Sequence, residues 1–132
     1  MVRLARGLPC DRMRVVDVIV RAEWMAIFVA GALGYLAMGG HPLLLLPLLL
    51  APDLSIVGYL AGPRVGAITY NSVHNLVVAL AALVTGWFLP LAWLALAGAI
   101  LFAHVGMDRT LGYGLKLPTD FRDTHLGRIG RA

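Results

Sequence analysis

The sequence predicts an all-α integral membrane protein: a bundle of four transmembrane helices with a short basic N-terminal segment and a polar C-terminal loop. Two observations predict this class. The chain has 132 residues, of which 60% are hydrophobic and 14% are charged, whereas about a quarter of the residues of a soluble domain are charged. The charges also gather in the terminal segments and one short turn, which leaves long apolar stretches between them. A chain of this length is expected to form one domain, residues 1–132.

Four apolar stretches are long enough to cross the ~30 Å hydrocarbon core of a bilayer, which takes about 20 residues. They cover about residues 22–38, 42–62, 65–87 and 89–107. The short turns between them are rich in Gly and Pro, which is typical of antiparallel neighbouring helices. The tail, residues 109–132, is polar and has no helical apolar period. We expect it to fold as a loop under the bundle; a disordered tail is the alternative.

The basic residues predict the orientation of the chain. Ten of the eleven lie at or before Arg21 or at or after Arg109, and the remaining one, Arg64, lies in the second turn. With four spans these regions share a side, which the positive-inside rule assigns to the cytoplasm. We therefore expect an inner (plasma) membrane protein with both termini cytoplasmic. The net charge of +4 then faces anionic lipid headgroups, and nucleic acid is not an expected partner because the sequence has no basic, aromatic-interleaved soluble surface.

Four ionisable residues, Asp53, His74, His104 and Asp108, lie inside the apolar stretches. At ~1.5 Å per residue, Asp53 and His74 lie roughly 13 Å from the cytoplasmic face. His104 and Asp108 lie in the last turns of the fourth stretch, four residues apart and so on one helix face. An ionised Asp near mid-membrane costs on the order of 2.5–3.5 kcal/mol, and such residues normally face the bundle interior and mark a functional site. We expect the four side chains to share one pocket.

Two carboxylates and two imidazoles form a ligand set for zinc and similar divalent cations. A bound cation would offset the burial of the carboxylates and could activate water for hydrolysis. The four residues are therefore the predicted metal ligands and catalytic residues. Arg109, Lys116 and Arg64 are candidates for holding a phosphate-like group. Tyr70 and Asn71 are candidates for supporting the ligands from behind.

Two segments, LAPDLSIVGYLAGPRVGAITYNSVHN and AHVGMDRTLGYGLKLPTDFRDTHLGRIG, resemble those of a family of small bacterial membrane proteins catalogued as domain of unknown function 4260. The resemblance runs from about Glu23 to Arg131. It implies a four-span helical bundle and leaves the activity unassigned.

The chain is also similar, more weakly, to membrane-bound metal-dependent hydrolases related to phospholipase-type zinc enzymes. These carry a Pro-Asp motif, a central His on a later span and an HxxxD followed by Gly, and Pro52-Asp53, His74 and His104 to Asp108 occupy comparable places here. In that family a second Asp and a His usually follow the Pro-Asp element, whereas this chain continues with Leu-Ser-Ile. Its central element reads Val-His-Asn in place of a Thr-His-Ser type sequence. The similarity therefore implies at most a single metal site.

The favoured function is a metal-dependent hydrolase acting on a lipid or phospho-ester at the cytoplasmic leaflet, with membrane lipids as partners. A small-solute or proton carrier, or a channel subunit, is an alternative that uses the same residues as a relay; it needs a homo-oligomer because four short spans enclose little volume. Haem or quinone binding through His74 and His104 is a third reading, which the adjacent carboxylates fit poorly. In the fourth, a non-enzymatic membrane assembly protein uses the polar cluster only to fix helix register.

Overall fold

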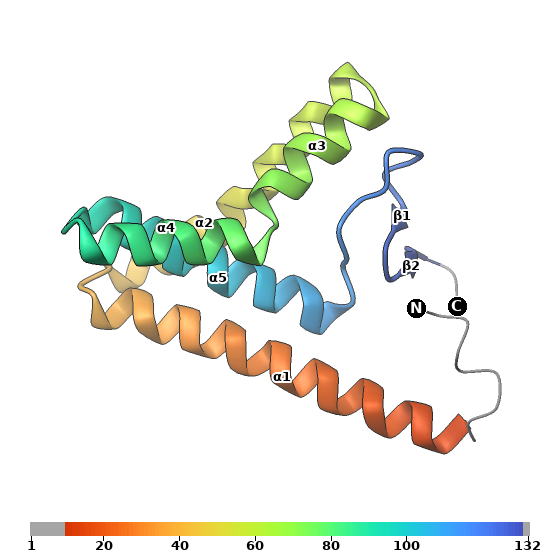
Figure 1. The fold of residues 1–132 in the computed structure, drawn as a ribbon, viewed down its shortest axis with the longest axis horizontal. Helices are drawn as coiled ribbons and strands as arrows, with labels where there is room; N and C mark the ends of the chain where they lie inside the picture. Colours follow the sequence, from red (N-terminus) through yellow and green to blue (C-terminus); the bar gives the residue numbers. More distant parts are fainter. Residues whose placement is uncertain (1–9, 131–132) are drawn as a thin grey trace.

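The computed structural model describes residues 10–130, which fold mostly into helices, as the sequence predicts (Figure 1). The helical elements are α1 (Cys10–Ala37), α2 (Pro42–Leu50), the 3-10 helix η2 (Ala51–Ala61), α3 (Pro63–Val73), α4 (Leu76–Phe88) and α5 (Ala92–Leu111). Two short strands follow, β1 (Asp123–Thr124) and β2 (Gly127–Arg128). Arg3 and Arg6 of the expected basic N-terminal segment lie outside the described residues.

Two helical stretches are long and apolar enough to cross a membrane, Pro42–Ala61 and Ala92–Leu111. Helices α3 and α4 form a third if the two together make one bent span. The first predicted span, residues 22–38, lies in α1 except for its last residue, and α1 is not among these candidates. Helix α1 begins well before residue 22 and carries Asp17 and Arg21, whose side chains pair at 3.7 Å across one helical turn. The structure is thus compatible with a membrane protein and contains two or three candidate spans.

The third predicted span is broken at His74 and Asn75 rather than continuous. The Asn75 side chain accepts hydrogen bonds from the backbone N–H groups of Val77, at 2.8 Å, and Val78, at 3.4 Å. It therefore caps the start of a new helix, and α4 is bent by 41° from α3. The break ends the α3 hydrogen-bond ladder and leaves the His74 carbonyl available to other partners.

The second predicted span changes its helix type at Ala51, where α2 passes into η2. In a 3-10 helix each carbonyl pairs with the N–H three residues on. For Leu49 that residue is Pro52, which has no N–H. The Leu49 carbonyl is therefore available to a side chain from another helix.

Helix α5 lies at the centre of the fold and packs along both α1 and α4 (Figure 1). Glycines allow these close contacts. A Cβ placed on Gly106 would lie 2.5 Å from the Phe28 nitrogen, and one on Gly31 would lie 2.6 Å from the Ala103 nitrogen. Small residues at such crossings let helix backbones approach closely, which is the usual way helices pack in membranes.

Helices η2 and α3 pack against each other as a hairpin that leans away from the rest of the bundle (Figure 1). The tail after α5 runs beside this hairpin. In the tail β1 and β2 pair antiparallel, with Asp123 opposite Arg128, and Lys116 forms an isolated bridge with Thr124. The expected C-terminal loop is thus folded, and it lies at the end of α5 that carries His104 and Asp108.

Candidate metal centre

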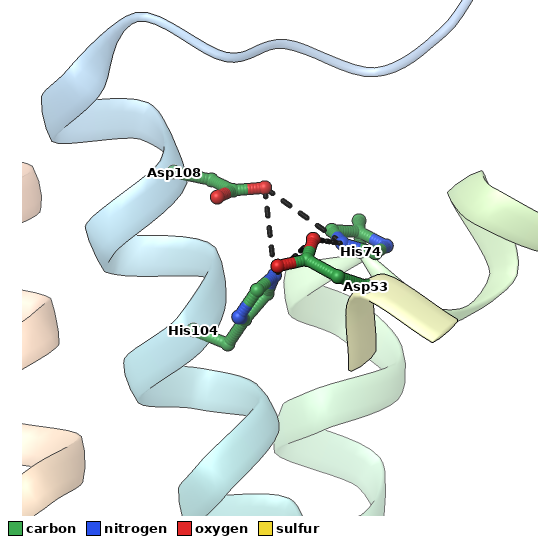
Figure 2. Close-up of side chains that lie close together, drawn as sticks. All are labelled: Asp53, His74, His104 and Asp108. Carbon is green, nitrogen blue, oxygen red and sulfur yellow. Dashed lines mark hydrogen bonds and ion pairs between the residues drawn. The ribbon is translucent and has the colours of Figure 1, made fainter. Parts of the chain in front are cut away.

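The four predicted ligands meet where η2, the end of α3 and the C-terminal half of α5 come together (Figure 2). The Nε2 atom of His74 lies 3.4 Å from Oδ1 of Asp53 and 3.8 Å from Oδ2 of Asp108. Nε2 of His104 lies 3.6 Å from each of the same two oxygens. One ligand atom from each residue lies within 4.8 Å of all the others. The convergence expected from the sequence is present.

Both imidazoles are oriented by backbone carbonyls. Nδ1 of His74 lies 2.9 Å from the carbonyl oxygen of Tyr70, and Nδ1 of His104 lies 2.6 Å from that of Leu49. A carbonyl oxygen only accepts hydrogen bonds, so both Nδ1 atoms carry the proton. In the neutral ring each Nε2 then presents a bare lone pair toward the carboxylates. With both rings neutral, the four converging atoms are therefore all acceptors.

This arrangement fits a metal ion better than a hydrogen-bonded cluster. The distances of 3.4–3.8 Å exceed the roughly 2.7–3.2 Å of an ordinary N–H···O bond. Ligands placed tetrahedrally at about 2.0–2.2 Å from zinc would be roughly 3.3–3.6 Å apart. The Nε2 atom of His104 is also buried without a hydrogen-bond partner among the described residues. Metal-binding imidazoles commonly donate their other N–H to a backbone carbonyl, as both do here.

Three of the four residues of the cluster are buried and the fourth is partly exposed. His74 and His104 have no exposed surface, and Asp108 is 5% exposed. The Asp53 side chain, in contrast, is 43% exposed. Burial of charge without compensation is costly, so a cation between the carboxylates would stabilise the folded state. The cluster is therefore accessible from the side of Asp53.

Tyr70 supports the cluster directly. Its hydroxyl donates a hydrogen bond of 3.0 Å to Oδ2 of Asp108, the same oxygen that faces the two imidazoles. Its ring stacks on the His74 ring, with centroids 3.6 Å apart and planes 9° from parallel. Asn71, predicted for a similar role, contacts the tail instead. Its amide donates to the carbonyl of Lys116 at 2.8 Å and accepts from the N–H of Lys116 at 2.7 Å.

The three predicted phosphate-binding cations lie in different places. Arg109 is buried, and its guanidinium donates to the carbonyls of His74, at 3.3 Å, and Tyr113, so it joins the α3–α4 break to the tail. Lys116 is also buried, with Nζ 5.1 Å from the Tyr70 ring centroid and 4.1 Å from that of Phe121. Arg64 is exposed at the start of α3, and among residues 10–130 it forms no ion pair or hydrogen bond with the cluster.

Lys116 is the cation best placed to act with the cluster. Burial lowers the pKa of its ammonium group, and the carboxylates of Asp108 and Asp53 partly offset this effect. The Lys116 ammonium group is therefore within electrostatic range of both carboxylates of the cluster.

Two features of the site were not predicted from the sequence. The carbonyls of Leu49 and Tyr70 orient the imidazoles, and Phe121 from the tail covers Lys116. Pro52 was a usable signal for the first, because a proline three residues on removes the 3-10 partner of the Leu49 carbonyl. No local signal in the sequence pairs Phe121 with Lys116.

The fold and the cluster define a class: a helical protein with membrane-length helices and a largely buried two-histidine, two-aspartate group that could hold a metal ion. The chain belongs to the family described as Domain of unknown function (DUF4260), whose family model matches residues 17–129. The family expected from the sequence is thereby confirmed. No curated protein and no solved structure matches the chain, so the weaker similarity to metal-dependent hydrolases has no support from these comparisons.

Proposed function

We propose that this protein is a divalent-metal-dependent hydrolase of the inner membrane that acts on a lipid or phospho-ester at the cytoplasmic leaflet. In this proposal four helices cross the membrane, with α1 as the first span and α3 with α4 as one bent span. Both termini and the Gly62–Pro63 turn face the cytoplasm, where the basic residues gather. Zinc is the proposed ion because imidazole and carboxylate are among its preferred ligands.

One observation carries the proposal: two imidazole nitrogens, fixed by backbone carbonyls, and two carboxylate oxygens converge, and when both rings are neutral no imidazole proton lies between them. Such a group is electrostatically unfavourable unless a cation lies at its centre. A cluster that served only to fix helix register would pair donors with acceptors. The carboxylate oxygens lie 3.4–3.8 Å from both Nε2 atoms, in the space that a porphyrin between the two imidazoles would occupy, which disfavours haem ligation.

The roles of the residues follow from their positions. Asp53, His74, His104 and Asp108 hold the ion, which when bound supplies Lewis-acid polarisation of the ester and activation of water. Tyr70 holds Asp108 in place through its 3.0 Å hydrogen bond. The ammonium group of Lys116 offers a charge for an anionic phosphate.

Hydrolysis of a phosphodiester in this site balances simply. The oxygen of a water molecule bonds to phosphorus, and the bond from phosphorus to the alcohol oxygen breaks. One proton of the water then ends on the departing alcohol. Asp53 is the ligand whose exposed side admits both water and ester.

Metal content and hydrolysis, measured on the same preparations, test the proposal. Protein purified in detergent with zinc is analysed by elemental mass spectrometry and assayed with para-nitrophenyl hexadecyl phosphate. Wild type should hold about one zinc ion per chain, and Asp53→Asn or His74→Gln should lose both the ion and the hydrolysis.

Asp120→Asn is the matched control for Asp53→Asn, because it makes the same chemical change at an exposed position away from the cluster. It should retain zinc and activity. Wild type without metal above background, or hydrolysis that survives both chelation and Asp53→Asn, would overturn the proposal. Proton-linked uptake into vesicles that survives chelation would point to the carrier function instead.

A further inference from the structure

We infer that an apolar groove between α2–η2 and α5 binds an acyl chain, so that the substrate is a membrane lipid rather than a water-soluble phospho-ester. The inference rests on the proposed function for the reaction, while the groove itself is argued from separate residues.

The groove has a volume of about 560 Å³ and an almost wholly apolar lining. Leu44, Leu48 and Pro52 line it from α2 and η2. Trp93, Ala97 and Leu101 line it from α5. Ligand sites are typically concave and mostly apolar, with a few polar groups placed at one point. Here the polar groups are those of the metal-binding cluster, which lies beyond one end of the groove.

Both walls of the groove contain residues that lie close in sequence to the metal-binding residues. On η2, the lining residue Pro52 directly precedes the ligand Asp53. On α5, the lining residue Ile100 is followed at four-residue spacing by His104 and Asp108. Residues four apart lie on one helix face, so the groove and the ligands occupy one continuous stripe of α5. A molecule lying in the groove would therefore have one end near the helix turns that carry the ligands.

The outer end of the groove offers no site for a charged head. The groove reaches the turn at Gly39, Gly40 and His41. There the Tyr35 hydroxyl is already bound to the His41 carbonyl at 3.2 Å, and Nδ1 of His41 accepts from the N–H of Leu43 at 3.3 Å. The charged groups that adjoin the groove are thus at its inner end. An amphiphile would place its head at the cluster and its chain toward the turn.

The length and direction of the groove suit an acyl chain. From Leu101 to Trp93 it extends roughly 12 Å along α5, taking 1.5 Å per residue. In the proposed topology the cluster lies in the cytoplasmic half of the membrane and the groove continues toward the opposite face. A lipid of the cytoplasmic leaflet directs its chains the same way. It can therefore enter head-first at Asp53 without turning over.

Filling the groove should separate a lipid from a small ester. Ala97 lines the groove from an exposed position on α5, so Ala97→Phe adds a ring there without pressing on the core. Ala81→Phe is the matched control, since Ala81 is also exposed, on α4, and does not line the groove. Zinc-loaded Ala97→Phe should hydrolyse para-nitrophenyl hexadecyl phosphate roughly tenfold or more slowly, the scale of loss for a chain excluded from an apolar pocket.

The same variant should keep its zinc and its rate on para-nitrophenyl methyl phosphate, which has no long chain. The Ala81→Phe control should resemble wild type on both probes. Equal rates of Ala97→Phe and Ala81→Phe on the hexadecyl probe would overturn the groove inference while leaving the proposed hydrolase intact.

A binding measurement makes the inference independent of turnover. Trp93 lines the groove, and Trp24→Phe with Trp87→Phe leaves it as the sole tryptophan. Brominated palmitic acid added to the protein in micelles should quench Trp93 saturably, and Ala97→Phe but not Ala81→Phe should abolish the saturable part. Saturable quenching of a protein that binds no zinc would support the groove inference and contradict the proposed hydrolase function. Quenching that never saturates would contradict the groove inference.

Discussion

Replacement of Gly31 by alanine tests how α1 is held against α5. The two backbones approach so closely there that a Cβ would lie 2.6 Å from the Ala103 nitrogen and 2.8 Å from its Cα and Cβ atoms. Non-bonded carbon atoms pack best at about 3.5–4.0 Å, so the two helices would have to separate by roughly 1 Å. The next residue on α5 is the ligand His104. The displacement should therefore reach the metal-binding cluster.

Gly34 supplies the control for the size of the effect. It lies one turn further along α1, and a Cβ there meets nothing within 4 Å. Both substitutions replace a glycine within a helix by alanine. This replacement by itself stabilises the helix by about 1 kcal/mol. This gain is common to both variants and cancels in their difference. Overpacking typically costs 1–3 kcal/mol, so Gly31→Ala should be less stable than Gly34→Ala by about that amount.

The assay is reversible unfolding in detergent micelles followed by circular dichroism, with zinc affinity measured by competition against a chelating dye on the same samples. Gly31→Ala should lower the free energy of unfolding relative to Gly34→Ala. It should also weaken zinc binding by roughly tenfold, the scale seen when groups that position metal ligands are disturbed. If the two variants unfold alike and bind zinc alike, the close crossing of α1 and α5 is wrong.

Three further outcomes are expected. Tyr70→Phe removes the hydroxyl bonded to Asp108 at 3.0 Å and should weaken zinc binding by roughly 10–100-fold; an unchanged dye-competition curve would contradict this. Asn71→Ala removes both hydrogen bonds to the Lys116 backbone and should speed tryptic cleavage after Lys116, whereas Ser72→Ala, at an exposed neighbour, should not. Because burial lowers the pKa of Lys116 below 10.5, the unfolded chain binds more protons than the folded one as the pH approaches that value. Stability should therefore rise with pH in this window, and a rise that persists in Lys116→Met would disprove the assignment.

The helical class and the identity of the four clustered residues could be predicted from the sequence. Apolar stretches of membrane length are a local property, and so is the cost of placing an ionisable residue inside one. The four-residue spacing of His104 and Asp108 also fixes their common face without knowledge of the partners. Asp53 and His74 were assigned to the same pocket from their estimated depth in the membrane, and the structure places both within the cluster.

The predicted supporting residues were only partly placed as expected, because their roles depend on contacts between distant segments. Tyr70 does contact a ligand, whereas Asn71, from the same turn of α3, binds the tail. Arg109 directly follows the ligand Asp108, yet its guanidinium is committed to backbone carbonyls. A helix turns 100° per residue, so adjacent residues face different partners. Only the packing of α3, α5 and the tail decides which partners those are.

The sequence by itself determined that this chain forms apolar helices, where its charges gather, and which two carboxylates and two imidazoles lie within the apolar stretches. The tertiary structure decided the break at Asn75, the 3-10 turn of η2 and the tautomer of each imidazole. The physical reason is the range of the forces involved. Hydrophobicity and helix periodicity act within a segment, whereas a free carbonyl such as that of Leu49 finds its donor 55 residues away, on another helix.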